Sequence, residues 1–235
     1  SMPAGEFVGA GLWQLFKGID SPYKSVLKLL LTEVYSSEHP QVRCLSLDFK
    51  QAIFAGQLDE DELDPYVMLY RKLERYLVNR GESERLELVR RCLYIKANVR
   101  LSRRSGMMDW KRNIMEKLVR EWHWGPRQLQ QMDDRTQWRI REVSAERRQL
   151  VNELTHSYRL LSQFGRSQDV INQVSARDLS LLGRRLYAAF ERKAGKIEFI
   201  NPGISPDLSE PVLTISQNLS ADEGEPYWSL YRGTL

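Results

Sequence analysis

Three lysines lie around a break between two helical patterns near the start of the chain, and together they can bind phosphate. Lys17 comes just before the break, and Lys24 and Lys28 come just after it. Ser21 and Pro22 are residues that commonly begin a helix. The N-terminal end of a helix attracts anions because its amides and its dipole are both positive there. The same lysines also fit the solvated faces of two amphipathic helices, and the pattern alone favours that simpler interpretation.

Residues that hold metals or act as nucleophiles show no useful spacing. The one Asp-x-Asp sequence, Asp59-Glu60-Asp61, lies in an acidic segment before a helical pattern, and no strand pattern precedes it. We interpret these carboxylates as helix N-terminal charges, with a metal site as the weaker alternative. His39, His123 and His156 are scattered, without zinc spacing or a nucleophile nearby. We therefore expect no catalytic or metal-binding residue in this chain.

The composition is that of an ordinary soluble globular protein. The 235 residues are 42% hydrophobic and 28% charged, with a formal net charge of +4. This mild positive charge permits an anionic ligand without requiring one. Cys44 and Cys92 lie in apolar helical patterns and are expected to be reduced. With no signal peptide and no apolar run long enough for a membrane span, we expect a cytoplasmic protein.

Apolar residues at helical spacing predict the elements that position these side chains. The fold class we expect is mainly α, a multi-helix domain with a small C-terminal antiparallel β element. The predicted helices cover residues 12–19, 22–31, 41–55, 66–78, 84–101, 107–122, 134–164 and 175–195. Ser83 is expected to cap one helix, and Ser175 with Asp178 to begin the last. A basic stripe on the helix 134–164 is expected to be solvated, and no nucleic-acid recognition motif accompanies it.

The pattern changes at Lys196, where prolines interrupt any helix. Short alternating or β-branched runs at 197–200, 212–219 and 227–231 are candidate strands, with 221–225 as the turn of an antiparallel hairpin. We therefore divide the chain into three parts. Residues 1–7 are a cloning scar (Ser1-Met2) and an N-terminal lead-in, residues 8–195 are a helical domain, and residues 196–235 are a small β element.

The amino-acid sequence of residues 6–17 resembles that of a known enzyme family. EFVGAGLWQLFK (6–17) resembles the signature of class I adenylate cyclases, the enterobacterial and pseudomonad type, which reads Glu-aromatic-aromatic-Gly-small-small-Leu-Trp-x-Leu-Tyr-Lys. Val8 replaces the second aromatic residue, Gly11 occupies the second small position, and Phe16 replaces Tyr. Further similar stretches follow in the family's order: IDSPYKSVLKLLL (19–31), ELVRRCLYIK (87–96), SYRLLSQFGR (157–166), RRLYAAFERKAGKI (184–197) and NPGISPDLSEP (201–211). The resemblance covers essentially the whole chain and is nearest to the Pseudomonas branch.

The resemblance implies that the intact enzyme converts ATP into 3′,5′-cyclic AMP and diphosphate, using Mg²⁺. The family is similar to nucleotidyltransferases, in which Gly-Ser precedes an Asp-x-Asp metal pair on a strand. This chain contains no Gly-Ser dipeptide, so by the family's order the metal-binding carboxylates belong upstream of Glu6. The resemblance therefore implies that this segment alone is inactive and holds neither ATP nor Mg²⁺. An upstream catalytic domain and a downstream regulatory domain of the same chain are the expected partners.

The resemblance also implies a role for the break between the first two helices. In nucleotidyltransferase-fold enzymes a helical domain closes over the nucleotide, with a lysine on one helix and a Ser-Tyr turn at the next helix facing the triphosphate. The group Trp13, Lys17, Ser21, Tyr23 and Lys24 looks similar. We predict Lys17, Ser21, Tyr23 and Lys24 as contacts of the ATP triphosphate, although Ser21 fits a helix cap better. The alternative is a helical module that binds a regulatory protein and does not contact ATP.

Overall fold

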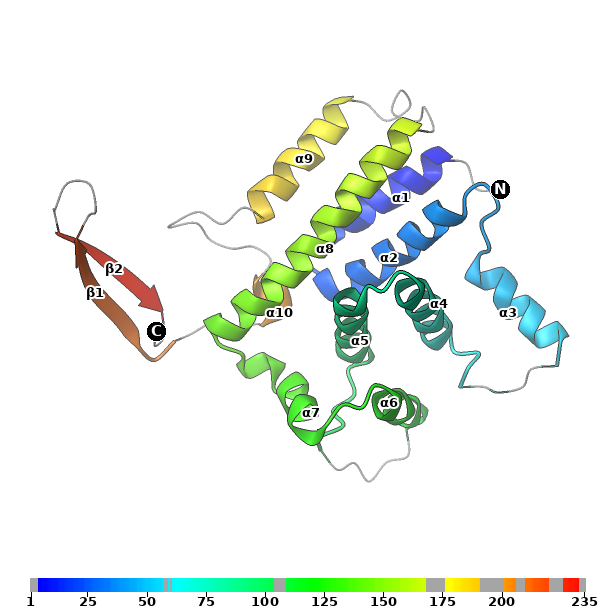
Figure 1. Cartoon of the computed structure of the whole chain (residues 1–235), viewed down its shortest axis with the longest axis horizontal. Helices are drawn as coiled ribbons and strands as arrows, with labels where there is room; N and C mark the ends of the chain where they lie inside the picture. Colours follow the sequence, from blue (N-terminus) through cyan, green and yellow to red (C-terminus); the bar gives the residue numbers. More distant parts are fainter. Residues whose placement is uncertain are drawn as a thin grey trace.

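The structure is a computed structural model that describes residues 4–56, 59, 61–103, 109–167, 176–190, 201–205, 210–219 and 226–232. It consists mainly of helices, with one two-stranded sheet near the C-terminus (Figure 1). The first helices are α1 (Ala4–Lys17), α2 (Pro22–Glu38), α3 (Leu45–Phe54), α4 (Pro65–Asn79) and α5 (Ser83–Ala97). They are followed by α6 (Trp110–Glu121), α7 (Pro126–Asp133), the 3₁₀ turn η1 (Arg135–Gln137), α8 (Ile140–Ser167), α9 (Ala176–Phe190) and α10 (Asn201–Ile204). The strands are β1 (Leu213–Leu219) and β2 (Pro226–Arg232).

Helix α2 is the centre of the helical body. It contacts α1, α4, α5 and α8, and in Figure 1 these helices surround it. Its buried side chains point in several directions around the helix: Val26, Leu27, Leu29, Leu30 and Val34. A helix that is apolar on most of its circumference must be enclosed by others, because only burial removes that surface from water. The body is therefore assembled around the second helix of the sequence signature.

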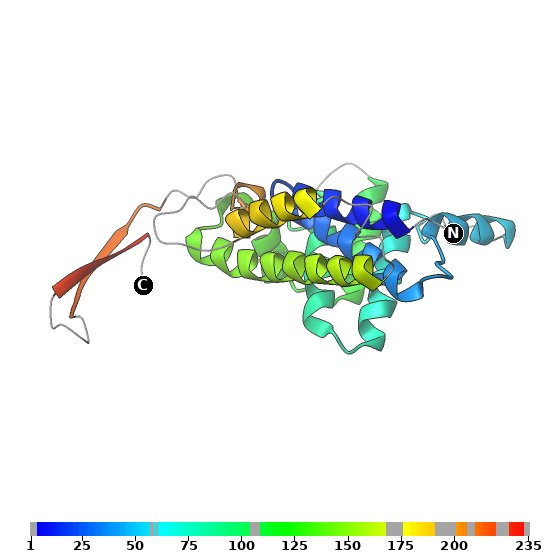
Figure 2. The ribbon, with the colours of Figure 1, turned by 90° about the horizontal axis from the view of Figure 1, so that it is seen from above.

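Helix α8 is a long helix that packs along this body. It has 28 residues, which corresponds to a length of about 42 Å at the usual rise of an α-helix. Val143, Leu150, Leu154 and Leu161 are buried on one face of it and pack toward α1 and α2. In Figures 1 and 2 it runs alongside both α1 and α9. Helix α8 thus lies beside α1 and α9, which come from the two ends of the helical part of the sequence.

A buried network of charges joins helices within this body. The guanidinium of Arg85 on α5 donates to both carboxylate oxygens of Glu33 on α2, at 3.0 and 2.6 Å, and to both oxygens of Glu153 on α8, at 2.8 and 2.6 Å. His156 lies 3.3 Å from Glu33, and Tyr76 on α4 donates to it at 3.1 Å. We call Glu33, Arg85, Glu153 and His156 the central ion cluster. It ties together helices that are far apart in sequence.

The mainly α fold with a small antiparallel β element is confirmed. Gly56 and Gly81 have positive φ angles of 73° and 69°, and each follows a helix that the sequence predicts to end there. Pro65 begins α4, and the preceding Asp64 accepts hydrogen bonds from the first amides of that helix. The two strands pair antiparallel, with Ile215 opposite Leu230. The expected strand 197–200 and turn 221–225 lie outside the described residues, as do Ser175 and Gly195.

Several local expectations were wrong. Ser83 is the first residue of α5 instead of its cap, and Glu82 stands at the cap position without a side-chain capping bond. Helix α5 ends at Ala97 rather than at 101, because Asn98 adopts a left-handed conformation with φ 55°. The long helix starts at Ile140, and the region around 134 is a 3₁₀ turn. Helix α7 was not expected, and α10 forms although Pro202 was expected to prevent a helix.

Two helices expected to bury apolar residues leave some of them in water. Trp110 begins α6 and is 57% exposed, whereas Ile114, Leu118 and Trp122 of the same pattern are buried. No residue of α3 is buried, and Leu47, Ile53 and Phe54 are exposed. In Figures 1 and 2, α3 lies at the edge of the body. Periodicity therefore identified the helices but not which of their faces are covered.

Candidate functional site

Helix α1 approaches α8 closely through two glycines, and this approach sets its orientation. A Cβ atom on Gly11 would lie 2.6 Å from both Cδ atoms of Leu161, and one on Gly18 would lie 3.0 Å from a methyl carbon of Leu154. Distances this short leave no room for a larger side chain without movement of the helices. The small residue within the signature is thus a packing requirement. The side of α1 that faces away from α8 is left to solvent.

The break between α1 and α2 leaves few backbone donors available. The amide of Ser21 bonds back to α1 at 2.9 Å, and the amide of Ser25 bonds to the carbonyl of Ser21 at 3.1 Å. Pro22 has no N–H. The amides of Tyr23 and Lys24 therefore remain as first-turn donors without a backbone acceptor among the described residues. Ser21 occupies the predicted N-cap position, but its side chain makes no capping hydrogen bond.

Aromatic and cationic side chains gather on the exposed side of α1. The ring of Trp13 stacks on Phe16 with centroids 6.0 Å apart, and the ammonium of Lys17 lies 5.2 Å from the Trp13 ring centroid. Arg185 on α9 places its guanidinium 5.5 Å from the ring centroid of Phe16. Trp13 is 55% exposed. Flat rings next to two cations form a surface that suits a planar anionic ligand.

The lysines of this region are accessible and carry uncompensated charge. Lys17, Lys24 and Lys28 are exposed, and within the described part of the chain none of them forms an ion pair. Lys17 ends α1 and Lys24 lies in the first turn of α2, on either side of the break. We call Lys17, Ser21 and Lys24, with the adjoining amides, the α1–α2 joint. Its cations remain available to an anion from outside.

The segment that contains α10 closes one side of the joint. A Cβ atom on Gly203 would lie 2.8 Å from Cδ of Pro22 and 3.0 Å from the carbonyl oxygen of Asp20. The following residue, Ile204, is fully buried, and its carbonyl accepts a hydrogen bond from the guanidinium of Arg135. Only a glycine allows this backbone to come so near the start of α2. Gly203 and the segment between α1 and α2 are therefore neighbours in space.

Tyr23 does not share the exposed position of the lysines. It is buried, and the Arg135 guanidinium lies 5.7 Å from its ring centroid. Burial, and secondly the nearby carboxylate of Glu146, raise the pKa of the Tyr23 hydroxyl above its ordinary value. The hydroxyl has no hydrogen-bond partner of normal geometry among the described residues. Of the four predicted contacts, the structure thus brings Lys17, Ser21 and Lys24 to one exposed region and places Tyr23 inside.

The described residues hold no metal site. Among them, no group of three or more His, Cys, Asp or Glu side chains could bind a metal ion. Asp59 instead accepts hydrogen bonds from the amides of Asp61 and Glu62, at 3.1 and 3.3 Å, and stabilises the turn before α4. Glu60 lies outside the described residues. No helix of the described part is long and apolar enough to cross a membrane.

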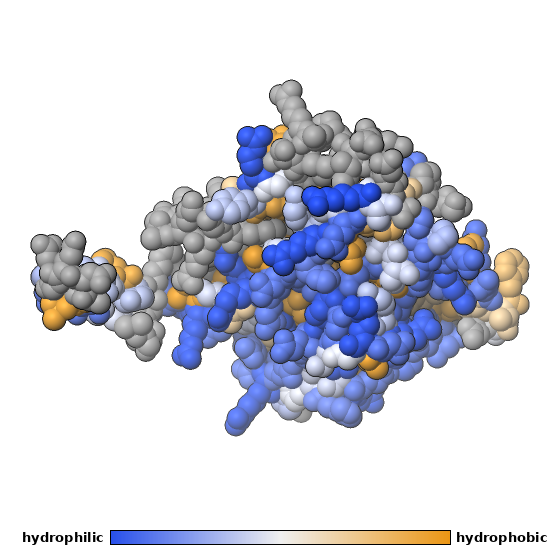
Figure 3. Space-filling model, turned by 45° about the horizontal axis from the view of Figure 1, so that its top comes forward, coloured by the Kyte–Doolittle hydropathy of each residue, from blue (hydrophilic) through white to orange (hydrophobic). Residues whose placement is uncertain are grey.

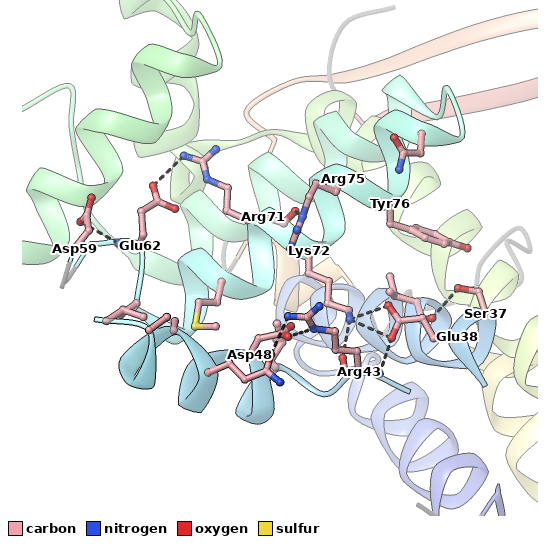
Figure 4. Close-up of a pocket in the computed structure, with 18 residues that line it drawn as sticks. Ser37, Glu38, Arg43, Asp48, Asp59, Glu62, Arg71, Lys72, Arg75 and Tyr76 are labelled. Carbon is pink, nitrogen blue, oxygen red and sulfur yellow. Dashed lines mark hydrogen bonds and ion pairs between the residues drawn. The ribbon is translucent and has the colours of Figure 1, made fainter. Parts of the chain in front are cut away.

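A broad groove between α3 and α4 contains cations, of which Arg43, Arg71 and Lys72 are already paired with carboxylates, whereas Arg75 donates only to the carbonyl of Arg71 among the described residues. Figure 4 shows Lys72 between Glu38 and Arg43, and its ammonium lies 2.8 Å from the Glu38 carboxylate and 2.7 Å from the Arg43 carbonyl. Arg43 pairs in turn with Asp48. Arg71 lies 2.7 Å from a carboxylate oxygen of Glu121, across to α6. These charges hold helices together, so the groove is a weaker anion site than the α1–α2 joint.

Sequence reasoning missed two residues that lie beside the first two helices, Arg185 and Gly203. Arg185 lies within the stretch 184–197, and Gly203 within the stretch 201–211, both of which were matched to the family. Each stretch could be recognised by its resemblance to the family. No spacing in the sequence, however, relates either stretch to the break near residue 20. The expected solvated basic stripe on the long helix was also partly wrong, because Arg147 is buried.

Comparison with known proteins gives a consistent result. The family described as "Adenylate cyclase, class-I, second domain" matches residues 2–201 of this chain. An adenylate cyclase of Escherichia coli O6:H1 is 42% identical over 231 residues, which cover 98% of this chain and 27% of that protein. An adenylate cyclase of Proteus mirabilis is 39% identical over 233 residues, with the same coverage of each chain. No solved structure matches. The chain spans 27% of the length of these relatives.

Proposed function

Because this chain belongs to the class I adenylate cyclase family, we propose that the full-length protein converts ATP into 3′,5′-cyclic AMP and diphosphate with Mg²⁺. In this proposal residues 8–195 act as a helical domain after a nucleotidyltransferase-like catalytic domain, and residues 196–235 as a separate β element. The enterobacterial relatives support the family. The nearer resemblance to the Pseudomonas branch stays a prediction. The protein is proposed to act in the cytoplasm, where its free cysteines, Cys44 and Cys92, would be reduced.

The α1–α2 joint is proposed to bind the triphosphate of ATP. One observation carries this proposal: Lys17 and Lys24 are exposed cations on either side of a helix start, without an ion pair among the described residues. The amides of Tyr23 and Lys24 add two donors, and the dipole of α2 adds a positive potential. Lys24 is unfavourable to that dipole, so an anion bound beside it relieves the conflict.

The residues of this chain are proposed to bind and orient, not to carry the metal. Magnesium would neutralise charge on the phosphates, but the carboxylates that hold it are proposed to lie upstream of Glu6. Ser21 can donate its hydroxyl to a phosphate oxygen because that hydroxyl is not used as a cap. By the same argument, this chain alone is expected to form no cyclic AMP.

The alternative is a helical module that binds a regulatory protein and does not contact ATP. One observation favours it. Leu47, Ile53 and Phe54 on α3 are exposed, and no residue of that helix is buried. Exposed apolar side chains grouped on one helix are common in protein-binding surfaces. This alternative predicts that α3, rather than the α1–α2 joint, determines activity.

Steady-state kinetics of the full-length enzyme distinguish the two proposals. We expect Lys17→Ala and Lys24→Ala each to lower kcat/KM for ATP by roughly ten- to a hundred-fold, the usual effect of losing a charge-assisted contact. Lys50→Ala on α3 is the matched control, since Lys50 is equally exposed and lies far from the joint in sequence. Wild-type kinetics for both joint variants would refute the triphosphate role. A fall in activity for Phe54→Ala but not for the joint variants would favour the regulatory module.

A further inference from the structure

The β-hairpin of β1 and β2 has one apolar face and one polar face. Side chains directly opposite each other on paired strands lie on the same face. The pairing of Ile215 with Leu230 and of Ser216 with Ser229 therefore separates two sets of residues. The mainly apolar face carries Leu213, Ile215, Leu219, Pro226, Trp228 and Leu230, and its register also includes Gln217, opposite Trp228, and Arg232, opposite Leu213. The polar face carries Thr214, Ser216, Asn218, Tyr227, Ser229 and Tyr231. Such a clear division is typical of a sheet with one buried side.

The apolar face is in water in this chain. Leu213, Ile215, Leu219, Trp228 and Leu230 are each more than half exposed. The strands contact each other extensively, whereas neither has more than marginal contact with any described helix. Figures 1 and 2 show the hairpin projecting beyond the helical body, and Figure 3 shows apolar side chains on its surface. An isolated two-stranded hairpin is at best marginally stable in water, so this face requires a cover.

The hairpin is not a loose tail of the helical body. Glu210, just before β1, accepts a hydrogen bond of 2.8 Å from the amide of Ile140 at the start of α8. The cross-strand bond from Asn218 to Ser229, at 2.9 Å, stabilises its polar face. The segment before the hairpin is therefore attached at a definite place, and a hydrogen bond joins the two strands on the polar face. Only the apolar side lacks a partner within the described residues.

The relatives are much longer than this chain. The match to the second domain of the family ends at residue 201, so the hairpin follows that domain. The alignments with the relatives cover 98% of the chain, and they therefore include most of the hairpin. Those relatives have 73% of their length outside the aligned part, because the alignment covers 27% of it. In those relatives, a large amount of polypeptide of the same molecule thus lies outside the segment that corresponds to this chain.

We propose that the apolar face of this hairpin is an interdomain docking surface, covered in the full-length protein by an apolar layer from the same polypeptide, outside residues 1–235. The hairpin then supplies two strands to a larger core, and its exposed edges can be paired as well. This inference does not depend on nucleotide binding at the α1–α2 joint. It assigns residues 213–232 a structural role between domains.

Amide hydrogen exchange tests the proposal directly. We compare the 235-residue chain with the full-length cyclase and follow the amides of 213–219 and 226–232. A covered hairpin opens less often, so exchange should be slower by roughly ten-fold or more in the full-length protein. The amides of α2 serve as the internal reference, because that helix is buried in both proteins. Equal exchange of the hairpin in the two proteins would overturn the proposal.

A pair of neighbouring substitutions tests which face is covered. Ile215→Lys places a charge on the apolar face, and Ser216→Lys places the same charge on the polar face of the same strand. In the full-length protein, Ile215→Lys should restore fast exchange in both strands, and Ser216→Lys should not. Ile215→Thr keeps the β-branched shape and should give an intermediate effect in the same direction. If Ser216→Lys has the larger effect, or if the variants do not differ, the assignment of the face is wrong.

Sedimentation velocity, together with exchange measured at two protein concentrations, tests whether a second copy of the chain covers this face. Protection that arises within one molecule does not depend on protein concentration. We therefore expect the full-length protein to show the same hairpin exchange when it is diluted and when it is concentrated. If protection appears only in a dimer, and Ile215→Lys converts that dimer to monomers, the surface joins two molecules and the proposal fails.

Discussion

The α1–α2 joint and the central ion cluster concentrate charge in opposite ways. At the joint, Lys17 and Lys24 are exposed and have no ion pair among the described residues. In the cluster, Arg85 contacts Glu33 and Glu153, and both carboxylates are almost completely buried. Charge that is paired and buried holds helices in place, whereas exposed and unpaired charge remains available to a ligand. The two regions share α2, so one helix serves both purposes.

The pKa values of Glu33 and His156 reflect the pairing of charges within the cluster. Burial alone would raise the pKa of Glu33, but hydrogen bonds from His156 and Arg85 outweigh it and lower that pKa to about 2. The hydrogen bond to Glu33 also raises the pKa of His156 above its ordinary value. Glu33 therefore keeps its charge across the physiological range. The following predictions test how far this contrast extends, beginning with the largest expected effect.

Removal of the shared cation should damage the cluster most. Arg85→Ala removes the guanidinium shared by the buried carboxylates of Glu33 and Glu153, and we expect a loss of about 3–5 kcal/mol in the free energy of unfolding. Urea denaturation followed by circular dichroism measures this. Arg80→Ala is the control, because Arg80 is half exposed and, among the described residues, its ion pair is with Glu82. Its loss should be about 0–1 kcal/mol. Equal losses for the two variants would contradict the assignment of the cluster as structural.

Acid should weaken the cluster through Glu33. Because its folded pKa of about 2 lies below the ordinary value of 4.5, its contribution is present above about pH 4.5 and is lost as the pH falls toward 2. This difference corresponds to a loss on the order of 2–3 kcal/mol. His156 acts in the opposite sense, since its raised pKa gives stability that disappears as the pH rises through the folded value. Glu33→Gln should flatten the acid limb of the stability profile, and an unchanged acid limb would refute this role.

Helix α1 is held against α8 by close packing, whereas the central ion cluster is held together by charge. Gly11→Ala places a Cβ atom 2.6 Å from Leu161, and we expect a loss of about 1–3 kcal/mol in stability. Gly9→Ala, two residues earlier in the same helix, meets nothing within 4 Å and should stabilise by about 0.5–1 kcal/mol. Thermal melts of both variants provide the comparison. A stabilising effect at both positions would show that α1 does not pack on α8 as described.

The smallest stability effect should come from the cations of the joint. Lys17→Ala and Lys24→Ala should each change the free energy of unfolding of the 235-residue chain by no more than about 0.5 kcal/mol. Lys24→Ala should if anything stabilise, because it removes a cation from the N-terminal end of α2. Calorimetric melts at low and high salt measure this. A loss larger than about 1 kcal/mol would mean that these lysines are structural, and the contrast with the cluster would disappear.

Much of the fold can be predicted from the sequence because its signals are local. The break after Lys17, the start of α2 at Pro22, the Asp64 cap with Pro65, and the ends at Gly56 and Gly81 are each decided by a few adjacent residues. Proline and glycine restrict or permit backbone angles wherever they occur. The same reasoning placed Ser83 one residue from its observed position and missed α7. Local preferences therefore locate elements better than they locate their ends.

The candidate site was only partly predictable for the same reason. Lys17, Ser21 and Lys24 lie within eight residues of sequence, and the structure keeps them on one exposed region. Tyr23 lies between them in sequence, yet it is buried. Helical geometry turns neighbouring side chains to different sides, and only the position of α5 and α8 decides which side is covered. Sequence pattern alone could not decide this.

The sequence by itself determined the family, the helical class, the break at the joint and the amphipathic hairpin, since residue types and short spacings carry that information. The tertiary structure alone decided which charges are neutralised. Arg85 is 52 residues from Glu33 and 68 from Glu153 along the chain, and Arg185 and Gly203 reach the first two helices from the far end. Such contacts follow from which helix faces exclude water from each other. Which helix faces are buried is decided by the packing of the whole helical body around α2, because the burial of a side chain depends on all of its neighbours at once.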